Sequence, residues 1–204
     1  AETGAEGKTA EITFDRLQGF GTVSITGWTY GQSANIPVPV SETNGTANVT
    51  YLYKSTDGKG YSAANAPVNA GSYKVTATFE KTDAYSECTA TAEFTIAKAI
   101  PTPADVTGLK ASYGDTLSSV ALPAGWAWKD GSVKVGNAGS NSFDAVYTPA
   151  DIQNYELLTS DLTVTVDPKE IAADFSAVAA SYPYTGQEIK PVVKVADGQN
   201  AVPA

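Results

Sequence analysis

The residues that could carry out catalysis in this chain are carboxylates, because the sequence contains no histidine. Its absence excludes Ser-His-Asp and Cys-His mechanisms and the usual zinc ligand sets. Paired carboxylates alone can still hydrolyse glycosides. Four acidic residues lie close together in the sequence, namely Glu80, Asp83, Glu87 and Glu93. In a chain with a net charge of −9 such residues are usually solvated. We therefore expect no catalytic residues and predict that the protein is not an enzyme.

A candidate for ligand binding is the pair Trp126 and Trp128, which share one face of an expected strand because residues i and i+2 point the same way. Two indoles that faced solvent would form a platform on which sugar rings stack. The alternative is that both indoles pack into the core or against a neighbouring unit. Ala127 on the opposite face is also apolar, so the pattern does not decide between these interpretations.

We expect no metal or cofactor site. Cys88 is the single cysteine, so no disulfide can form within the chain, and such a residue is usually inert. The Asp-Gly-Lys-Gly run at residues 57–60 is too short for a calcium loop and contains a lysine. The acidic charge disfavours nucleic acid as a partner. No segment approaches the roughly 20 apolar residues of a membrane span, so we also expect no membrane insertion.

An internal repeat organises the elements that carry these residues. The run Asn-Ala-Gly-Ser occurs at residues 69–72 and again at 137–140, an offset of 68 (137 − 69). After each run, apolar and polar residues alternate as they do in a half-buried strand. Gly71 and Gly139 suit the turn before that strand. Arrays of similar small domains commonly act as spacers or as displayed binding surfaces.

A tyrosine follows the next turn in both copies, as Tyr85 and Tyr155. Each precedes a further alternating strand, centred nine residues later at Phe94 and Val164 (94 − 85 and 164 − 155). In immunoglobulin-like sandwiches a tyrosine near a strand start hydrogen-bonds back across the connecting loop. We expect both tyrosines to have this structural role.

The repeat divides the chain into four parts. Residues 1–20 resemble the last strand of a preceding repeat, 21–99 and 100–169 form two full modules, and 170–204 begin a third. We therefore expect the chain to be a fragment of a longer protein. Prolines in both junctions should stiffen the links between modules.

These motifs resemble the MBG-type repeats of bacterial surface proteins. The resemblance rests on Gly27–Gln32, the Asn-Ala-Gly turn and the Asp-Ala-Tyr corner at residues 83–85, and it covers roughly residues 20–204. It implies an extracellular, all-β, repeated module on the surface of a bacterium, notably a Gram-positive one. The family has no known catalytic residues to carry over.

The fold class that we predict is all-β, with tandem immunoglobulin-like sandwich modules; β-grasp-like modules with a short helix are the alternative. A longer loop is expected at 55–66, and a short helical turn at 149–153 with Thr148 as its cap. Strands are expected at 22–30, 47–54, 72–80, 89–97, 106–112, 118–122, 126–129, 141–148, 161–167, 174–179 and 189–195.

The function that the sequence favours is a stalk or spacer whose partners are the neighbouring repeat modules of the same protein. Repetition, stiff junctions, acidity and the missing catalytic chemistry all support this interpretation. The alternative is an adhesion module that binds carbohydrate or a host surface protein. It would need an exposed patch, for which Trp126, Trp128 and the loop 55–66 are the candidates.

Overall fold

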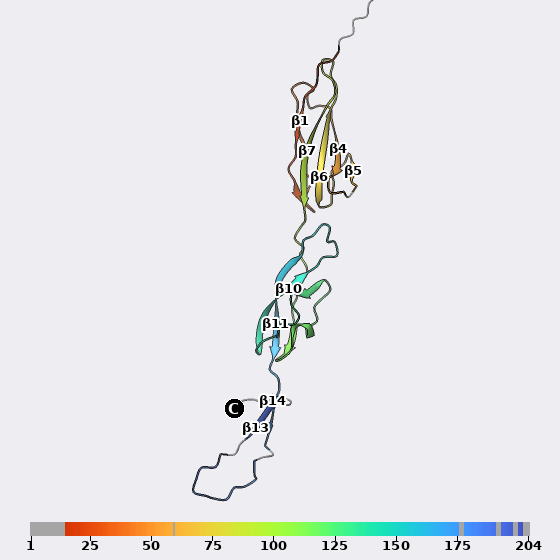
Figure 1. Ribbon diagram of the computed structural model, residues 1–204. Helices are drawn as coiled ribbons and strands as arrows, with labels where there is room; N and C mark the ends of the chain where they lie inside the picture. Colours follow the sequence, from red (N-terminus) through yellow and green to blue (C-terminus); the bar gives the residue numbers. More distant parts are fainter. Residues whose placement is uncertain (1–14, 59, 176–177, 191–192, 198–199, 202–204) are drawn as a thin grey trace, which may run out of the picture. The chain divides into compact units, whose positions relative to one another are not determined.

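The computed structural model describes residues 15–58, 60–175, 178–190, 193–197 and 200–201. Contacts divide the chain into two units, which are coloured along the sequence in Figure 1. Unit 1 holds the described residues up to Pro101 together with Pro149–Leu157. Unit 2 holds Thr102–Thr148 and the described residues from Leu158 onward. Strands dominate both units, and the single helical element among the described residues is the 3₁₀ turn η1 (Leu117–Ser119). The predicted all-β class is therefore confirmed.

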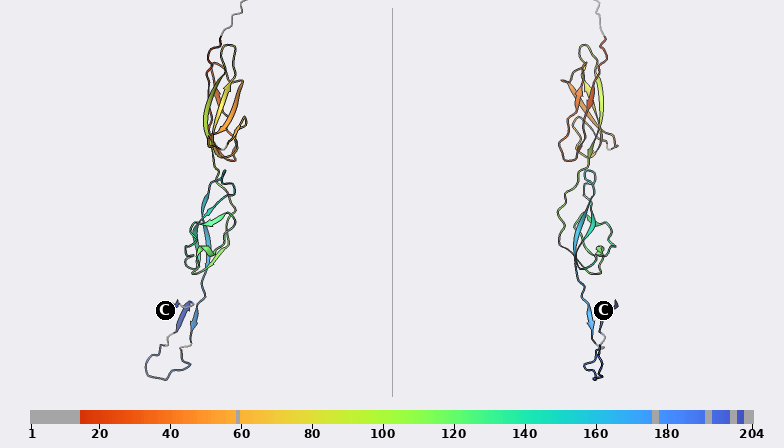
Figure 2. Two further views of the ribbon diagram at one scale, coloured as in Figure 1. Left: turned by 45° about the vertical axis from the view of Figure 1, so that its right-hand side comes forward. Right: turned by 90° about the vertical axis from the view of Figure 1, so that its left-hand side faces the viewer.

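Unit 1 is built on a five-stranded sheet in the order β2-β7-β6-β4-β5. The strands are β2 (Trp28–Thr29), β7 (Cys88–Ala97), β6 (Gly71–Phe79), β4 (Val49–Ser55) and β5 (Ser62–Ala63). Neighbours pair antiparallel except β2 and β7, which run parallel. The long strands β6 and β7 form the central hairpin of the unit (Figure 2).

A second, smaller layer covers this sheet. It consists of β1 (Thr22–Ser24) and β3 (Val38–Val40), which pair antiparallel, and β1 lies beside β7 and β6 (Figure 1). Alternate residues of a strand point to the same face, and on β6 this places Tyr73, Val75 and Phe79 in the core. The alternation of β6 therefore determines which face of the sheet is covered.

Aromatic rings fill the centre of unit 1. Phe94 on β7 stacks on Trp28 and on Tyr73, with ring centroids 5.1 and 5.7 Å apart. Tyr53 on β4 meets the same ring edge-on at 6.1 Å. Such pairs are favourable beyond the area that they bury. Packing through Trp28 therefore holds the short strand β2 to the sheet in addition to its backbone bonds.

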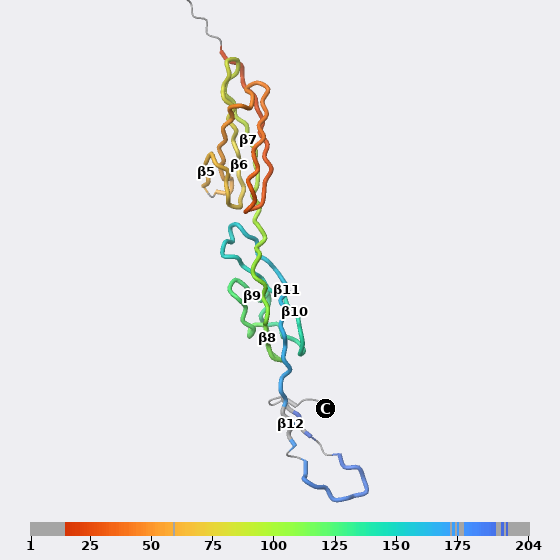
Figure 3. Tube along the Cα trace, turned by 180° about the vertical axis from the view of Figure 1, so that it is seen from behind, coloured from red at the N-terminus to blue at the C-terminus, as the bar shows by residue number. Residues whose placement is uncertain are grey.

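Unit 2 contains a four-stranded sheet in the order β8-β11-β10-β9, which Figure 3 shows from behind. The strands are β8 (Leu109–Ser112), β11 (Leu158–Asp167), β10 (Gly139–Tyr147) and β9 (Trp126–Trp128). The first and last of these strands in the sequence, β8 and β11, pair in parallel, and the other neighbours pair antiparallel. The first four strands of the sheet in unit 1 pair with the same directions.

The segment that contains η1 covers the core of unit 2. Leu117 and Val120 are buried together with Val135, in one cluster with residues of the sheet. The Leu117 N–H donates to the Val133 carbonyl at 2.9 Å, and the Val135 N–H donates to the Asp115 carbonyl at 3.1 Å. These bonds join the two sides of the covering segment into a second layer.

The remaining described strands form a small sheet of their own. β12 (Ala172–Asp174), β13 (Lys194–Asp197) and β14 (Asn200–Ala201) pair antiparallel in that order. They lie within residues 170–204, where the sequence predicts the start of a third module. Of residues 1–20, which are predicted to form the tail strand of a preceding repeat, residues 1–14 lie outside the described residues.

Several elements differ from the sequence-based expectations. The strand predicted at 118–122 overlaps η1, because Leu117 and Val120 are both buried and a spacing of three suits a 3₁₀ turn. Neither β3 nor β5 was expected, and β5 lies inside the predicted loop 55–66. At 149–153 the structure has no helix: residues 152–154 form a turn, in which the Asp151 carboxylate accepts the Asn154 N–H at 3.2 Å, so the expected helical turn with Thr148 as its cap is wrong.

Candidate functional site

The structure places Trp126 and Trp128 on the inner face of the sheet in unit 2. Both indoles are partly buried and pack against the core, whereas Ala127 between them is exposed. Trp126 packs against Tyr147 with ring centroids 5.4 Å apart, and Trp128 meets Phe143 edge-on at 6.3 Å. Each indole therefore already has an aromatic partner within the unit.

A hydrogen bond also fixes one of the two indoles. The Nε1–H of Trp128 donates to the carbonyl oxygen of Val120 at 3.0 Å. An indole N–H that is removed from water usually has such a partner, and here the bond links β9 to the segment after η1. This geometry favours packing over sugar stacking as the role of the pair.

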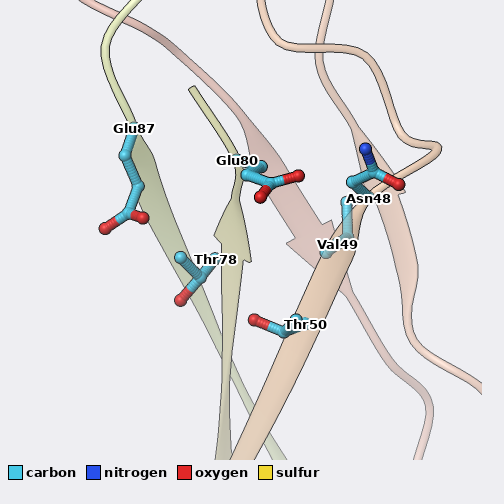
Figure 4. Close-up of a pocket in the computed structure, with 6 residues that line it drawn as sticks. All are labelled: Asn48, Val49, Thr50, Thr78, Glu80 and Glu87. Carbon is cyan, nitrogen blue, oxygen red and sulfur yellow. The ribbon is translucent and has the colours of Figure 1, made fainter. Parts of the chain in front are cut away.

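Two of the acidic residues singled out in the sequence line an open hollow of about 440 Å³ in unit 1 (Figure 4). Glu80 directly follows β6 and Glu87 directly precedes β7, and the Glu80 carboxylate extends toward Asn48 (Figure 4). Both glutamates are exposed to solvent. Neither therefore has the apolar pocket in which carboxyl groups act as catalytic acids.

The other two acidic residues lie elsewhere on unit 1. Glu93 is exposed in the middle of β7, directly opposite Lys74 on β6. Asp83 is exposed in the turn between the two strands. Neither of them lines the hollow with Glu80 and Glu87.

Cys88 begins β7 and is partly buried. Burial raises the pKa of its thiol, and the neighbouring Glu87 carboxylate raises it further. The thiol also hydrogen-bonds to Oδ1 of Asn44 at 3.8 Å. Because the thiolate is the reactive form of cysteine, this setting makes Cys88 less reactive at neutral pH.

Metal binding finds no support among the described residues, where no cluster of histidine, cysteine, aspartate and glutamate side chains is arranged to hold an ion. In the same part of the chain, no helix is long and apolar enough to cross a membrane. Neither a protein-family model nor a curated protein matches this chain.

Both repeats begin with a segment that pairs in parallel with the end of the same repeat, and we call it the entering segment. In unit 1, Leu17 pairs with Tyr85 and Trp28 pairs with Ile96, both in parallel. The offset is 68 residues for both pairs (85 − 17 and 96 − 28). The entering segment thus runs in one register beside the corner tyrosine and the end of β7.

The second copy also pairs in parallel, with two offsets that differ by one residue (155 − 99 is 56 and 164 − 109 is 55). In unit 1, Ala99 pairs in parallel with Tyr155, and in unit 2, Leu109 pairs in parallel with Val164. Main-chain atoms make the bond at the corner, since the Ala99 N–H donates to the Asn154 carbonyl at 2.9 Å. Both corner tyrosines therefore lie where the entering segment meets the end of a repeat.

A cation occupies the same position beside each corner. Nε of Arg16 donates to the Thr82 carbonyl at 2.7 Å, and Nζ of Lys98 donates to the Ile152 carbonyl at 2.7 Å. Each cation directly precedes the residue that pairs with the corner tyrosine. The two corners therefore share a side-chain contact as well as a backbone pairing.

A buried asparagine distinguishes the second corner from the first. Asn154 is 5% exposed, and its Oδ1 accepts the Ala70 N–H at 2.8 Å. Its Nδ2 donates to Oδ1 of Asn69 at 3.2 Å. The ring of the next residue, Tyr155, meets Tyr30 edge-on at 5.4 Å. All five residues belong to unit 1, so this turn completes that unit.

The two glycines of the repeated turn begin equivalent strands, Gly71 in β6 and Gly139 in β10. Gly139 has a φ of +122°, which side chains rarely allow. A Cβ on Gly71 would lie 2.8 Å from the Asp57 carboxylate. The backbone conformation therefore favours glycine at Gly139, whereas the close approach at Gly71 is to the end of an exposed side chain, which can shift.

Sequence reasoning did not single out two structural asparagines, Asn44 and Asn154. Nδ2 of Asn44 donates to the carbonyl oxygens of Glu80 and Ser86, both at 2.9 Å. Asparagine in a turn is usually interpreted as a local turn former. One signal could have drawn attention to Asn154, because the first copy has Ala84 at the same place before its corner tyrosine.

Proposed function

We propose that this chain is a non-catalytic, load-bearing spacer segment of a protein on the bacterial cell surface. The observation that carries the proposal is the parallel pairing of the entering segment with the last long strand, which occurs in both copies. Neighbouring repeat modules of the same protein are the partners that this role requires.

The direction of that pairing determines how a repeat responds to tension. When the two ends of a repeat are pulled apart, the entering segment moves backward while its parallel neighbour moves forward. The hydrogen bonds between them are then loaded together, in shear. In an antiparallel hairpin pulled at its open end, the bonds break one after another. Parallel terminal strands should therefore slow unfolding under force, and this rate governs mechanical lifetime.

Other observations support a repeated spacer. β6 and β10 each have nine residues, and β7 and β11 each have ten. The two-layer packing of unit 1 supports an immunoglobulin-like sandwich. The extracellular location and the Gram-positive source rest on the resemblance to MBG-type repeats. Solvated carboxylates and the absence of histidine support a non-catalytic role.

Single-molecule pulling with two attachment geometries tests the load-bearing role in unit 1. In a Cys88→Ser chain, handles on Asp15→Cys and Ala97→Cys load the parallel pairing in shear. Handles on Ser72→Cys and Ala97→Cys open the β6–β7 hairpin from its end, because Ser72 pairs near that end of β7. We expect the unfolding force to be several-fold higher in the first geometry. Equal forces would refute the proposal.

Binding assays test the adhesion alternative. We expect the full chain to bind no member of an array of glycans and host matrix proteins specifically. Specific binding that disappears in a Trp126→Ala/Trp128→Ala chain, while circular dichroism shows an intact fold, would instead favour an adhesion module. Iodide quenching of tryptophan fluorescence should be weak in the unaltered chain, since both indoles are partly buried.

A further inference from the structure

The turn before β6 in unit 1 is already covered by a partner. Ala70 is 3% exposed, and its N–H donates to Oδ1 of Asn154. The ring of Tyr30 makes a T-shaped contact with the ring of Tyr155. We call Tyr30, Asn69 and Ala70 the receptor surface of unit 1. Its ligand is the turn that contains Asn154 and Tyr155.

Unit 2 has a tyrosine in the same structural position as Tyr30. The N–H of Tyr30 donates to the carbonyl of Ala97, the last residue of β7, at 2.8 Å. The N–H of Tyr113 donates to the carbonyl of Asp167, the last residue of β11, at 2.9 Å. Tyr113 therefore occupies in unit 2 the place that Tyr30 occupies in unit 1.

The repeated turn is also held in the same way in both units. The Tyr73 hydroxyl donates to the Asn69 carbonyl at 2.8 Å, and Nδ2 of Asn141 donates to the Asn137 carbonyl at 2.8 Å. In each case the donor stands four residues after the asparagine. Unit 2 therefore holds Asn137 and Ala138 in the same arrangement in which unit 1 holds Asn69 and Ala70.

The two surfaces differ in exposure at their alanines. Ala138 is exposed, whereas Ala70 is 3% exposed; both Asn69 and Asn137 are exposed. Tyr113 is 49% exposed, although its ring is a large apolar group. We propose that Tyr113, Asn137 and Ala138 form a docking surface for the asparagine-tyrosine turn of a further copy of this repeat. The inference deepens the proposed spacer role and rests on its repeat organisation.

The contacts that Asn154 and Tyr155 make in unit 1 define which turns the docking surface of unit 2 can bind. The incoming turn must supply a side-chain amide, which accepts the Ala138 N–H and donates to the Asn137 side chain. It must also supply a tyrosine ring for Tyr113. A corner of the type found at Ala84 and Tyr85 lacks the amide and should not dock. The surface therefore discriminates between the two kinds of corner in this sequence.

Inserting a second copy of residues 98–167 between Asp167 and Pro168 tests this inference. A Val133→Ile change in the inserted copy would distinguish its peptides by mass from those of the original. We expect hydrogen–deuterium exchange at the original Ala138 amide to slow about tenfold on insertion. An Asn154→Ala change confined to the inserted copy should abolish the slowing, and Asn154→Asp should retain part of it because the acceptor oxygen remains.

The outcomes separate this inference from the spacer proposal. Unchanged exchange at Ala138, or slowing that survives Asn154→Ala in the inserted copy, would overturn the docking surface. The chain without the insertion provides a positive control. In that chain, Asn154→Ala should accelerate hydrogen–deuterium exchange at the Ala70 amide. The pulling experiment on unit 1 does not involve Ala138, so each idea can fail while the other stands.

Discussion

Gly21 is the point at which the entering segment passes over the buried ring of Phe79, and Gly21→Ala should destabilise unit 1. An added Cβ would lie 2.5 Å from Cε2 and 2.7 Å from Cζ of Phe79, which is fully buried. Such overpacking costs roughly 1–3 kcal/mol. The folding equilibrium constant of unit 1 should therefore fall roughly 5- to 150-fold.

A chain that also carries a substitution at Phe79 shows whether the Phe79 ring causes the loss of stability. Phe79→Ala should itself cost about 3–5 kcal/mol, because it leaves a cavity; Phe79→Val is the milder substitute if the chain fails to fold. In either background Gly21→Ala should become nearly neutral, since the clash is gone. Gly131→Ala is the matched control, because its Cβ would lie 3.5 Å from Ser118, an ordinary contact.

Urea unfolding followed by NMR is the assay, because the indole N–H signals report the units separately. The signal of Trp28 reports unit 1, and those of Trp126 and Trp128 report unit 2. Gly21→Ala should shift the urea midpoint that the Trp28 signal reports and leave the midpoints of the other two signals unchanged. A shift of equal size in both Phe79 backgrounds, or no shift in either, would refute the steric argument.

Three further predictions concern polar groups. Asn44→Ala removes two hydrogen bonds to main-chain carbonyls and should cost unit 1 about 2 kcal/mol in urea unfolding. Burial raises the pKa of Cys88, so iodoacetamide should alkylate it more slowly at neutral pH than in the unfolded chain, with the rate rising at higher pH. The hydrogen bond from Lys129 lowers the pKa of Asp144. That contact stabilises the fold above the ordinary carboxyl pKa and is lost as pH falls through the lowered one. In an NMR titration, Lys129→Ala should therefore raise the Asp144 midpoint, without changing stability in strong acid.

The sequence predicted the long central strands well. The alternation in residues 72–80 and 141–148 corresponds to β6 and β10 to within one or two residues, because one face of each strand is buried. β3 was not foreseen, since Pro39 lies at its centre and Val38 and Val40 are exposed. Without a buried face, a strand carries little periodic signal.

Contacts between distant residues were beyond the reach of sequence patterns. The partner of Asn154 at Ala70 stands 84 residues earlier in the chain, so no local motif marks the asparagine as buried. The tryptophan pair shows the same limit, because Ala127 suits either face of a strand. Exposing one methyl group costs little, whereas burying both indoles removes a large apolar area from water.

The outer strands of the sheets are short, and this affects how closely copies of the repeat can be placed without aggregating. β2 and β5 each contain two residues, β9 contains three and β8 contains four. Similar sequences placed side by side are prone to misassembly, because a strand of one copy can pair with the sheet of another. Short edges present few unpaired N–H and carbonyl groups to such a strand. Many copies could then be carried at high density without aggregating through their sheet edges.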